Sequence, residues 1–517
     1  MNHFNKLFLA GLFFLAVSCN QVSEKNTTYF FDAASGSDLN SGTSASHPFQ
    51  SFEKILHLNL KPGDSILLKS GAIFTEKLYL SAKGSPEKPI VIGKYGGEVK
   101  PYLKGDATKR EMVHIYNSEH LIIRDLEISN RGNKPMPNLN GLYVELDNYG
   151  VAKNITVDNL FIHDIFGSLF KGDGYQHEEV GAGQAILLES LKSGERDSIP
   201  SCFDGLLIQN CLIKDCQRNG IMMWGNWIRK HWFPSRNVII RNNVLDGVPG
   251  DGIVPVGCES PLVEYNVMKN CPDLLPDSEA CDGIWPWSCD NAVIQYNIVS
   301  NHHSKVDGYG FDSDYNCRNS LFQYNISYNN TGGFLLICNS GGWTEDWSAG
   351  NVGTIIRYNL SINDGLRDYL MEKGHKPYFS PVIHITGPVK NTIIEKNLFY
   401  VLKKQKPEID KTIVNLTNWK GYADSTFFAS NFLFVEEPNL AVETTLSTHN
   451  FYHGNVFVGL LSVPNGGFKK SEDKFNQSLW FQKEDTNWVN LVRFIGDKTV
   501  PINGELIPIT KILGIEN

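Results

Sequence analysis

A short segment recurs along most of this 517-residue chain, and it restricts the fold more than any other feature. Each copy is a run of mostly apolar residues that ends in asparagine, as in Val293-Ile-Gln-Tyr-Asn297 and Leu321-Phe-Gln-Tyr-Asn325. Most copies lie 23 to 38 residues apart, and one longer interval separates Asn159 from Asn210. The asparagines that we align are Asn159, Asn210, Asn243, Asn266, Asn297, Asn325, Asn359, Asn397 and Asn431. Self-similarity with such a period is typical of a stacked array in which each copy forms one coil.

The pattern within each copy favours strands. The apolar residues alternate or run together, as they do in strands, and do not follow the 3.6-residue period of a helix. The copies are also too short to supply the four strands of a propeller blade. We therefore predict an all-β parallel β-helix solenoid. Stacked asparagine side chains would hydrogen-bond along the array and to the turn backbone, and asparagine tolerates the left-handed backbone of tight turns.

A second strand is predicted after the asparagine in the central coils. Side chains alternate along a strand, so the second and fourth residues of each segment would point inward and the third and fifth outward. The inward positions include Ile221, Ile253, Ile284, Phe311 and Phe334, followed two residues later by Met223, Pro255, Pro286, Ser313 and Leu336. The aligned segments are Gly220–Trp224, Gly252–Val256, Gly283–Trp287, Gly310–Asp314 and Gly333–Ile337.

Cysteine is concentrated in the same region. Nine of the ten cysteines lie between Cys202 and Cys338, and no two of them have the CxxC spacing of a thiolate metal site. We align Cys258, Cys289, Cys317 and Cys338 as one buried column with a structural role. The sequence does not decide whether a disulfide forms within this column, because an exported protein permits one.

The N-terminus predicts export. Lys6 precedes the apolar run from Leu7 to Val17, which is too short to span a bilayer. The run ends in Ala16-Val17-Ser18-Cys19, which resembles a bacterial lipobox. This predicts a lipoprotein signal peptide over residues 1–19, lipidation at Cys19 and a tether over residues 20–27. The mature protein would be anchored to the cell envelope, at the outer membrane or its periplasmic face. An ordinary signal peptide is the alternative.

The net charge of −9 and the absence of a basic stripe argue against nucleic acid as a partner. The expected partner is instead a polysaccharide or oligosaccharide, with the membrane contacted only through the lipid at Cys19.

Two stretches carry a family resemblance. The first runs from DAASGSDLNSG, beginning at Asp32, to LKPGDSILLKSGAIF, ending at Phe74, and the second is DGYGFDSDYNC, beginning at Asp307. Together they resemble secreted right-handed parallel β-helix proteins of the pectin-lyase-like superfamily, over roughly residues 28–435. The resemblance implies a right-handed coil and a carbohydrate-active enzyme. The Asn-Thr-Asp, Asp-Asp, Gly-His-Gly and Arg-Ile-Lys set of polygalacturonases is absent in that order, so pectin hydrolysis is not implied.

On this reading the β-helix covers residues 28–460. Residues 28–110 would form an N-terminal cap that includes a short helix, with Phe52, Ile55 and Leu56 on its apolar face. Residues 461–517 would cap the far end or pack along the side.

The outward positions of two neighbouring strands combine acids and aromatic rings. Asp312 and Asp314 would lie beside Trp285 and Trp287, because neighbouring strands are about 4.8 Å apart and alternate residues about 6.7 Å. Glycoside hydrolysis uses one protonated and one ionised carboxyl group, and indole rings stack on sugars. We expect Asp312 to act as the general acid or as the nucleophile or base, with Asp314 or Asp282 as its partner. The expected substrate is a plant or algal polysaccharide or its oligosaccharides.

Further side chains are predicted to contact the sugar, and no cofactor is required. Asp251 stacks on Asp282 at the entrance of successive strands, and Glu189 shares the register of Asp314. The predicted substrate-binding residues are Trp285, Trp287, Asp251, His303, Trp224 and Glu189.

Two other functions remain open. A polysaccharide lyase that acts on a uronate would use Lys305 as its base, with Ca²⁺ held by Asp282, Asp307, Asp312 and Asp314. A non-catalytic lipoprotein would bind glycans through the tryptophans. Lysine and arginine are scarce in the central coils, and a lyase needs a cationic groove for its acidic polymer, so we favour hydrolysis.

Overall fold

The computed structural model describes residues 26–458 apart from 173–179, 191–197, 343, 345, 370–377, 402–403, 436–438 and 445. It also describes residues 461–462, 474–475, 499–502 and 505–508. The predicted lipidation site Cys19 and most of the predicted C-terminal segment lie outside these residues, so both remain predictions. No helix in the described part of the chain combines the length and apolar character that a membrane span requires.

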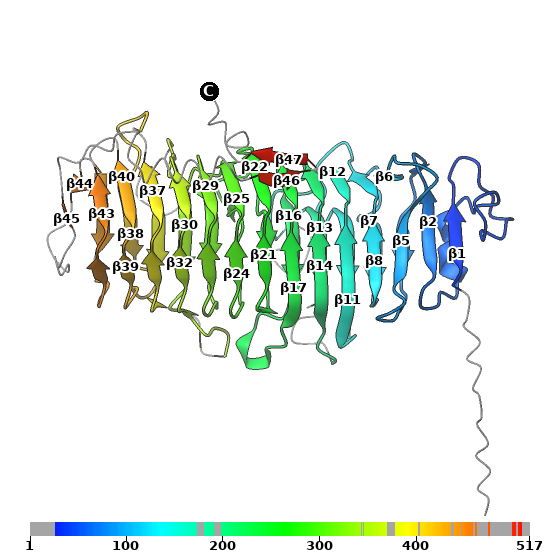
Figure 1. Ribbon diagram of the computed structural model, residues 1–517, viewed down its shortest axis with the longest axis horizontal. Helices are drawn as coiled ribbons and strands as arrows, with labels where there is room; N and C mark the ends of the chain where they lie inside the picture. Colours follow the sequence, from blue (N-terminus) through cyan, green and yellow to red (C-terminus); the bar gives the residue numbers. More distant parts are fainter. Residues whose placement is uncertain are drawn as a thin grey trace, which may run out of the picture.

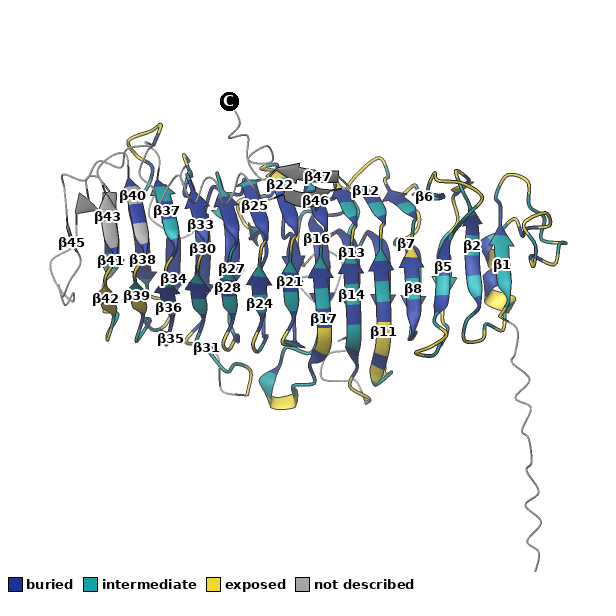
Figure 2. Cartoon of the chain, viewed as in Figure 1, coloured by how far each residue is buried: buried dark blue, intermediate teal, exposed yellow. Residues whose placement is uncertain are grey.

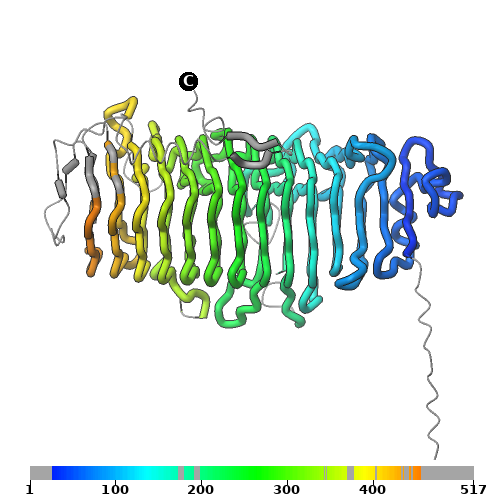
Figure 3. Tube along the Cα trace, viewed as in Figure 1, coloured from blue at the N-terminus to red at the C-terminus, as the bar shows by residue number. Residues whose placement is uncertain are grey.

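The chain forms a parallel β-helix, as predicted. Strands of successive coils lie side by side along the long axis (Figure 1), and the trace winds steadily from one end of the stack to the other (Figure 3). The largest sheet has 15 strands, with β20 (Cys258–Glu259) paired beside β17. Its main path is β1 (Thr28–Phe31), β2 (Ser65–Lys69), β5 (Ile90–Tyr95), β8 (Leu121–Arg124), β11 (Val151–Asp158), β14 (Cys202–Gln209), β17 (Ser235–Arg241), β21 (Leu262–Glu264), β24 (Val293–Gln295), β28 (Leu321–Gln323), β32 (Ile355–Arg357), β36 (Ile393–Glu395), β39 (Phe427–Ala429) and β42 (Phe451–His453).

A second sheet of 14 strands follows the asparagine turns. Each of its strands comes just after the strand of the first sheet in the same coil. Its order is β3 (Ile73–Phe74), β6 (Tyr102–Gly105), β9 (Glu127–Asn130), β12 (Phe161–Ile165), β15 (Leu212–Lys214), β18 (Val244–Asp246), β22 (Val267–Cys271), β25 (Ile298–His302), β29 (Ile326–Tyr328), β33 (Leu360–Ile362), β37 (Leu398–Val401), β40 (Phe432–Val435), β43 (Val456–Val458) and β45 (Lys474–Phe475).

The third face consists of two six-stranded segments. Single bridges from Ile253 to Ile284 and from Ile284 to Phe311 connect them. The first segment contains β4 (Leu78–Leu80), β7 (Glu111–Tyr116), β10 (Asn140–Glu145), β13 (Gln184–Glu189), β16 (Asn219–Trp224) and β19 (Ile253–Val254). The second contains β27 (Tyr309–Ser313), β30 (Gly333–Cys338), β34 (Ile383–Thr386), β38 (Thr412–Thr417), β41 (Asn439–Thr444) and β44 (Leu461–Ser462).

Short pairs of strands complete the described structure. Two of the pairs are parallel, and the third is an antiparallel hairpin. They are β23 (Ala280–Cys281) with β26 (Val306–Asp307), β31 (Asn351–Val352) with β35 (Val389–Lys390), and β46 (Thr499–Ile502) with β47 (Glu505–Pro508).

The core lies inside the coils and is formed by the inward side chains of all three faces (Figure 2). The five predicted inward residues from Ile221 to Phe334 are all fully buried in one apolar cluster. The glycines that begin these strands are required by close packing. A Cβ on Gly283 would lie 2.3 Å from the carbonyl oxygen of Gly310.

The predicted asparagine ladder is present. Asn297 is typical: its Oδ1 accepts the backbone N–H of Asn266 at 3.0 Å, and its Nδ2 donates to the Oδ1 of Asn325 at 3.1 Å. The pattern continues through Asn431 to Asn455. Two assignments were wrong by one residue, because Gln209 pairs with Arg241 and so places Asn210 opposite Asn242 rather than Asn243. Asn159 and Asn210 instead occupy turn positions with φ of 53° and 57°.

The register of the last aligned strand differs from the prediction by one residue. Tyr309 pairs with Gly333, so Asp312 lies beside Leu336 and Ser313 beside Ile337. Leu336 therefore points outward, while Leu335 and Ile337 join the core. A shift of one residue moves side chains to the other face because the side chains alternate. Phe334, at the start of the strand, nevertheless stays in the core.

This shift also removes Cys338 from the predicted cysteine column. Cys258, Cys289 and Cys317 lie in the core, whereas Cys338 belongs to an outward cluster with Tyr309 and Leu336. All nine cysteines from Cys202 to Cys338 are buried free thiols. The disulfide left open by the sequence is therefore not formed among them.

The predicted short helix is a 3₁₀ helix from Phe52 to His57. Phe52 and Ile55 are buried, as expected, but Leu56 is 61% exposed. A 3₁₀ helix has three residues per turn, so residues three apart share a face and the fourth position falls away from it.

Candidate active site

A cleft of about 690 Å³ opens on the outward side of the third face, where its two segments meet. Trp285 and Trp287 line one end, and strands β34 and β38 line the other. Four acids lie between these ends: Asp282, Asp307, Asp312 and Asp314. The cleft thus holds most of the predicted catalytic and sugar-binding side chains in one place.

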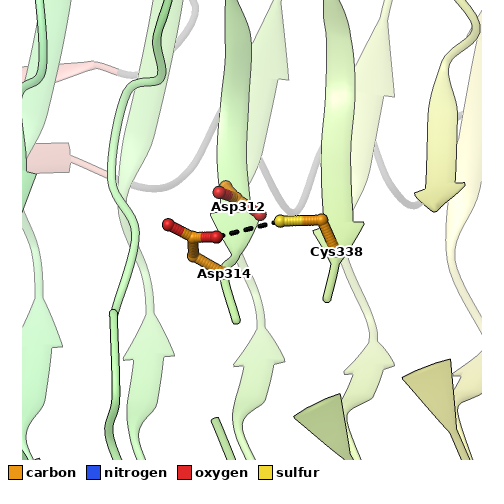
Figure 4. A group of neighbouring side chains, drawn as sticks. All are labelled: Asp312, Asp314 and Cys338. Atoms are coloured by element: carbon orange, nitrogen blue, oxygen red, sulfur yellow. Dashed lines mark hydrogen bonds between the residues drawn. The ribbon is translucent and has the colours of Figure 1, made fainter. Parts of the chain in front are cut away.

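Asp312 and Asp314 point outward from the end of β27 and face Cys338 on β30 (Figure 4). The bridge from Ile284 to Phe311 sets the register that places Asp312 beside Trp285 and Asp314 beside Trp287. The sequence predicted this neighbourhood correctly. It did not predict how enclosed it is: Asp312 is only 3% exposed and Asp314 only 8% exposed.

Asp314 is held by two hydrogen-bond donors. The backbone N–H of Tyr315 donates to its Oδ1 at 2.6 Å, and the thiol of Cys338 donates to the same oxygen at 2.9 Å. Burial raises the pKa of Asp314 to about 7, although both donors and the charge of Lys171 favour the ionised form. Asp314 can therefore carry a proton near neutral pH and release it.

Asp312 has a different environment. Its Oδ1 is buried and has no hydrogen-bond partner among the described residues. Burial raises the pKa of Asp312 well above its ordinary value, and the nearby charges of Asp314, Asp282 and Asp307 raise it further. Burial therefore favours the neutral form of Asp312, which can donate a hydrogen bond.

Asp282 and Asp251 stack as predicted, but they differ in charge. The backbone N–H of Asp282 donates to Asp251 at 3.0 Å. Burial raises the pKa of Asp282 well above its ordinary value, and the charge of Asp307 adds to this effect. Burial also acts on Asp251, but Arg218 at 2.6 Å and Lys171 hold the pKa of Asp251 below its ordinary value. Asp251 is thus an ionised partner of a buried arginine.

Asp307 reaches the cleft from a separate strand. Asp307 is the last residue of β26, which pairs with β23. Arg367 donates a hydrogen bond to the backbone carbonyl of Asp307. Its φ of 54° is left-handed. Asp307 is half-buried, in contrast to the other three acids of the cleft. Its charge also raises the pKa of Asp314, so the two carboxyl groups act on each other across the cleft.

The tryptophans form one wall. The Nε1–H of Trp285 donates to Asp251 at 3.1 Å, which fixes the ring. Trp287 packs edge-on against Trp224, with ring centroids 5.3 Å apart. The Nε1–H of Trp287 is buried and has no acceptor among the described residues.

Several predicted residues do not line the cleft. Trp224 is buried beneath Trp287, and Glu189 is fully buried and accepts a hydrogen bond from Tyr143. Glu189 does share the column of Asp314, as predicted, but on more distant strands that are covered. His303 is exposed at the end of β25, on a different face, and its backbone N–H donates to Cys271. These positions leave no direct contact with a sugar at Asp314.

Lys305, the base of the lyase alternative, also points elsewhere. Its Nζ lies 3.1 Å from Asp273 and 2.8 Å from the carbonyl of Leu275. The lysine that lines the cleft is Lys171, whose Nζ is 3.9 Å from Asp251. Lys171 comes from the long insertion between Asn159 and Asn210, where no repeat provides an alignment.

The sequence also missed the residues at the far end of the cleft, which are His384, Thr386, Thr417, Asn418 and Trp419. The asparagine ladder predicts the coils to which these residues belong. However, no glycine precedes the strands that begin at Ile383 and Thr412, so the glycine-led pattern used for alignment is missing there. Cys338 was missed because of the one-residue shift.

The donor set does not fit the calcium site of the lyase alternative. Among the described residues, the possible metal ligands within 4.8 Å of one another are Asp312, Asp314 and Cys338. Calcium takes six to eight oxygen ligands. This group offers a soft sulfur, and burial keeps the pKa of the Cys338 thiol well above its ordinary value.

Comparison with known proteins supports the fold. Residues 193–346 match the family model of the right-handed β-helix region. The chain has a right-handed β-helix fold. The crystal structure of the GH136 lacto-N-biosidase from Eubacterium ramulus superposes with a TM-score of 0.58 and 21% sequence identity, covering 84% of this chain and 67% of that one. The selenomethionine form of the same enzyme gives the same values.

One relative is also similar in sequence. The lacto-N-biosidase of Bifidobacterium longum subsp. longum is 29% identical over 435 residues, an alignment that covers 66% of this chain. The alignment covers 26% of that relative, so the chain spans about a quarter of its length.

Proposed function

We propose that this protein is a glycoside hydrolase of the lacto-N-biosidase type, which releases the disaccharide lacto-N-biose from larger glycans. Two facts support this: the sequence similarity to a lacto-N-biosidase, and a cleft that combines acids with a tryptophan wall. The proposal replaces the plant or algal polysaccharide expected from the sequence with an oligosaccharide that carries lacto-N-biose.

The observation that carries the proposal is the pairing of Asp314 with Asp307 in this cleft. With a pKa raised to about 7 by burial, Asp314 carries a proton over much of the neutral range. A general acid is most effective when its pKa lies near the working pH. We assign Asp314 as the group that protonates the glycosidic oxygen.

We assign Asp307 as the carboxylate partner of Asp314. Asp282 and Asp312 are buried, and burial keeps their pKa values well above the ordinary range. Asp251 is ionised but is already neutralised by Arg218. Asp307 keeps contact with solvent, which stabilises its charge. It also approaches from a different strand than Asp314, as a pair that flanks a glycosidic bond requires.

The reaction then follows from these two groups. Asp314 donates its proton to the glycosidic oxygen while the bond from that oxygen to the anomeric carbon breaks. The carboxylate of Asp307 stabilises the positive charge that develops on the sugar. A water molecule then forms the new bond to the anomeric carbon, and its proton passes to a carboxylate of this pair. Burial favours the neutral forms of Asp312 and Asp282, which can supply hydrogen bonds to sugar hydroxyl groups. Trp285 and Trp287 exclude water and present their rings to the sugar.

The test compares two leaving groups. The substrates are the 4-nitrophenyl glycoside of lacto-N-biose and an oligosaccharide that carries the same disaccharide at its non-reducing end. Asp314→Asn should lower kcat on the oligosaccharide by about 10²- to 10⁴-fold. It should affect the nitrophenyl glycoside much less, because nitrophenolate leaves without a proton. Asp307→Asn should impair both substrates.

Asp273→Asn is the matched control, because Asp273 pairs with Lys305 outside the cleft and its loss should leave both rates unchanged. Release of an unsaturated product, seen as new ultraviolet absorbance, would instead establish the lyase. Binding of lacto-N-biose glycans without any product would establish the non-catalytic alternative.

A further inference from the structure

The cleft extends beyond the acids mainly in one direction. Beyond Asp314, the next outward residues in its column are Cys338 on β30, Thr386 on β34 and Thr417 on β38. In the column of Asp312 they are Leu336 and then His384. The floor of the cleft is therefore apolar at β30 and polar at β34 and β38. The polar floor begins two strand spacings, or about 10 Å, from the acids.

A chain of hydrogen bonds crosses this polar floor. The hydroxyl of Thr417 donates to Oγ1 of Thr386 at 2.9 Å. Since that proton is committed, Oγ1 of Thr417 accepts from Nε2–H of His384, which lies 2.8 Å away. The order of donors leaves the hydroxyl hydrogen of Thr386 without an acceptor among the described residues. A donor at the end of such a chain is oriented and ready to bind a sugar hydroxyl or an acetamido carbonyl.

Aromatic side chains enclose this end of the cleft. Phe379 contacts the ring of His384 at a centroid distance of 4.9 Å, with the planes at 78°. Trp419 follows β38 and packs edge-on against Tyr315 at 5.5 Å, which leaves it 36% exposed. The described residues lining this end include no carboxylate, lysine or arginine. Hydroxyl donors beside an exposed indole ring suit an uncharged sugar.

The opposite end is short. Trp285 and Trp287 occupy the strand next to the acids, and one strand further Val254 and Val256 are fully buried. These valines lie in a packed cluster with Trp224 and Tyr143. Within the described part of the chain, only the end formed by β34 and β38 therefore continues along the column of Asp314 for the length of a disaccharide.

We propose that β34 and β38 carry the subsite for the outer sugar of the released disaccharide, with Thr386 as the hydrogen-bonding residue, oriented by Thr417 and His384, and Trp419 as the stacking surface. The inner sugar then lies over Leu336 and Cys338, next to Asp314. This assignment rests on the proposed function. It makes the enzyme selective for a disaccharide, because a single sugar would leave the Thr386 hydroxyl and the Trp419 ring unused.

The test measures binding in the absence of turnover. Lacto-N-biose and, separately, each of its two component sugars are titrated into the Asp314→Asn protein by calorimetry. Thr386→Val, which keeps the shape of the side chain, is added to remove the donor, and Trp419→Ala is added to remove the ring. We expect each to weaken lacto-N-biose about 3- to 10-fold, as loss of one hydrogen bond or one stacking contact does.

The same substitutions in the active protein should raise KM on the nitrophenyl disaccharide, with a smaller effect on kcat. Trp347→Ala is the matched control, because Trp347 is exposed but lies outside the cleft. Circular dichroism verifies that each variant is folded.

Unchanged affinity for lacto-N-biose in both variants would overturn the subsite while leaving the proposed function intact. Loss of affinity only in Trp285→Phe would place the outer sugar at the opposite end and would also overturn it. If the Asp314→Asn protein does not bind lacto-N-biose and the unsubstituted protein does not hydrolyse its glycosides, the subsite and the proposed function fail together.

Discussion

The chemistry of the cleft depends on how differently its acids are solvated. Asp312 and Asp314 are two residues apart on one strand, yet their hydrogen bonding differs. Asp314 accepts two hydrogen bonds at one oxygen, whereas Oδ1 of Asp312 has no partner among the described residues. Hydrogen bonds to a carboxylate favour its charged form. Burial raises the pKa of both acids, and the two donors act against this rise at Asp314, whose pKa is about 7.

The first prediction concerns pH. A general acid must be protonated, and the pKa of Asp314 is raised by burial to about 7. We therefore expect kcat/KM to be maintained below about pH 7 and to fall as the pH rises through that value. The measurement is a pH profile of kcat/KM on an oligosaccharide with an unactivated leaving group. A basic limb that stays flat to pH 9 would exclude Asp314 as the acid.

A second prediction concerns Cys338. Its thiol stabilises the charged form of Asp314, so Cys338→Ala should raise the pKa of Asp314 and shift the basic limb of the profile to higher pH. Cys338→Ser retains a donor and should keep the limb near its original position. A limb that does not move in Cys338→Ala would mean that the hydrogen bond does not tune Asp314, whatever the change in rate.

At the scale of the coil, the asparagine ladder fixes the turn between the first and second sheets. The Nδ2 of Asn297 also donates to the carbonyl of Val263 at 2.9 Å, so one side chain serves the backbone of the preceding coil and the amide of the next. These groups are buried, and unpaired polar groups in the interior are costly. The ladder therefore provides hydrogen-bond partners for the buried polar groups of the turn in every coil from Asn243 to Asn455.

The third prediction tests this ladder. Asn297→Ala would leave the backbone N–H of Asn266 and the carbonyl of Val263 unpaired and buried, which should lower the free energy of unfolding by about 3 kcal/mol. Gln295→Ala is the matched control from β24, the strand just before Asn297, because Gln295 is only partly buried. Urea unfolding measures both. Equal effects of the two substitutions would contradict a special role for the ladder.

At the scale of the molecule, the stack is stable through a continuous core and without covalent cross-links in its described part. A single apolar cluster extends from Phe31 to Tyr452, because each coil buries its inward residues against the next. Six of the nine buried cysteines contribute to this packing as small apolar side chains. They are Cys211, Cys216, Cys258, Cys271, Cys289 and Cys317. A long solenoid buries enough surface that it does not need the disulfides on which small exported domains depend.

The corresponding prediction is that reducing agent leaves the stability unchanged. The melting temperature of the protein lacking residues 1–19 should be the same with and without dithiothreitol. Thiol titration in denaturant, with no reductant added, should find all nine cysteines free. A titration that finds seven free thiols, together with a lower melting temperature after reduction, would reveal a disulfide.

The sequence by itself determined the parallel β-helix, the face on which Asp312 and Asp314 lie, and their neighbours Trp285 and Trp287. Repetition makes this possible, because a residue at a given position of one coil lies above its equivalent in the next. The same logic failed where the repeat is irregular. A single-residue offset at Gly333 concealed Cys338, and the insertion that supplies Lys171 has no counterpart in other coils.

Only the tertiary structure decided the depth of the cleft and the charge of each acid. These properties depend on loops that fold back over the third face, and no periodic pattern encodes their paths. Asp282, Asp307, Asp312 and Asp314 look alike in sequence. We propose different roles for them because a carboxyl group takes its pKa from the water, donors and charges around it, which come from residues far apart in the chain.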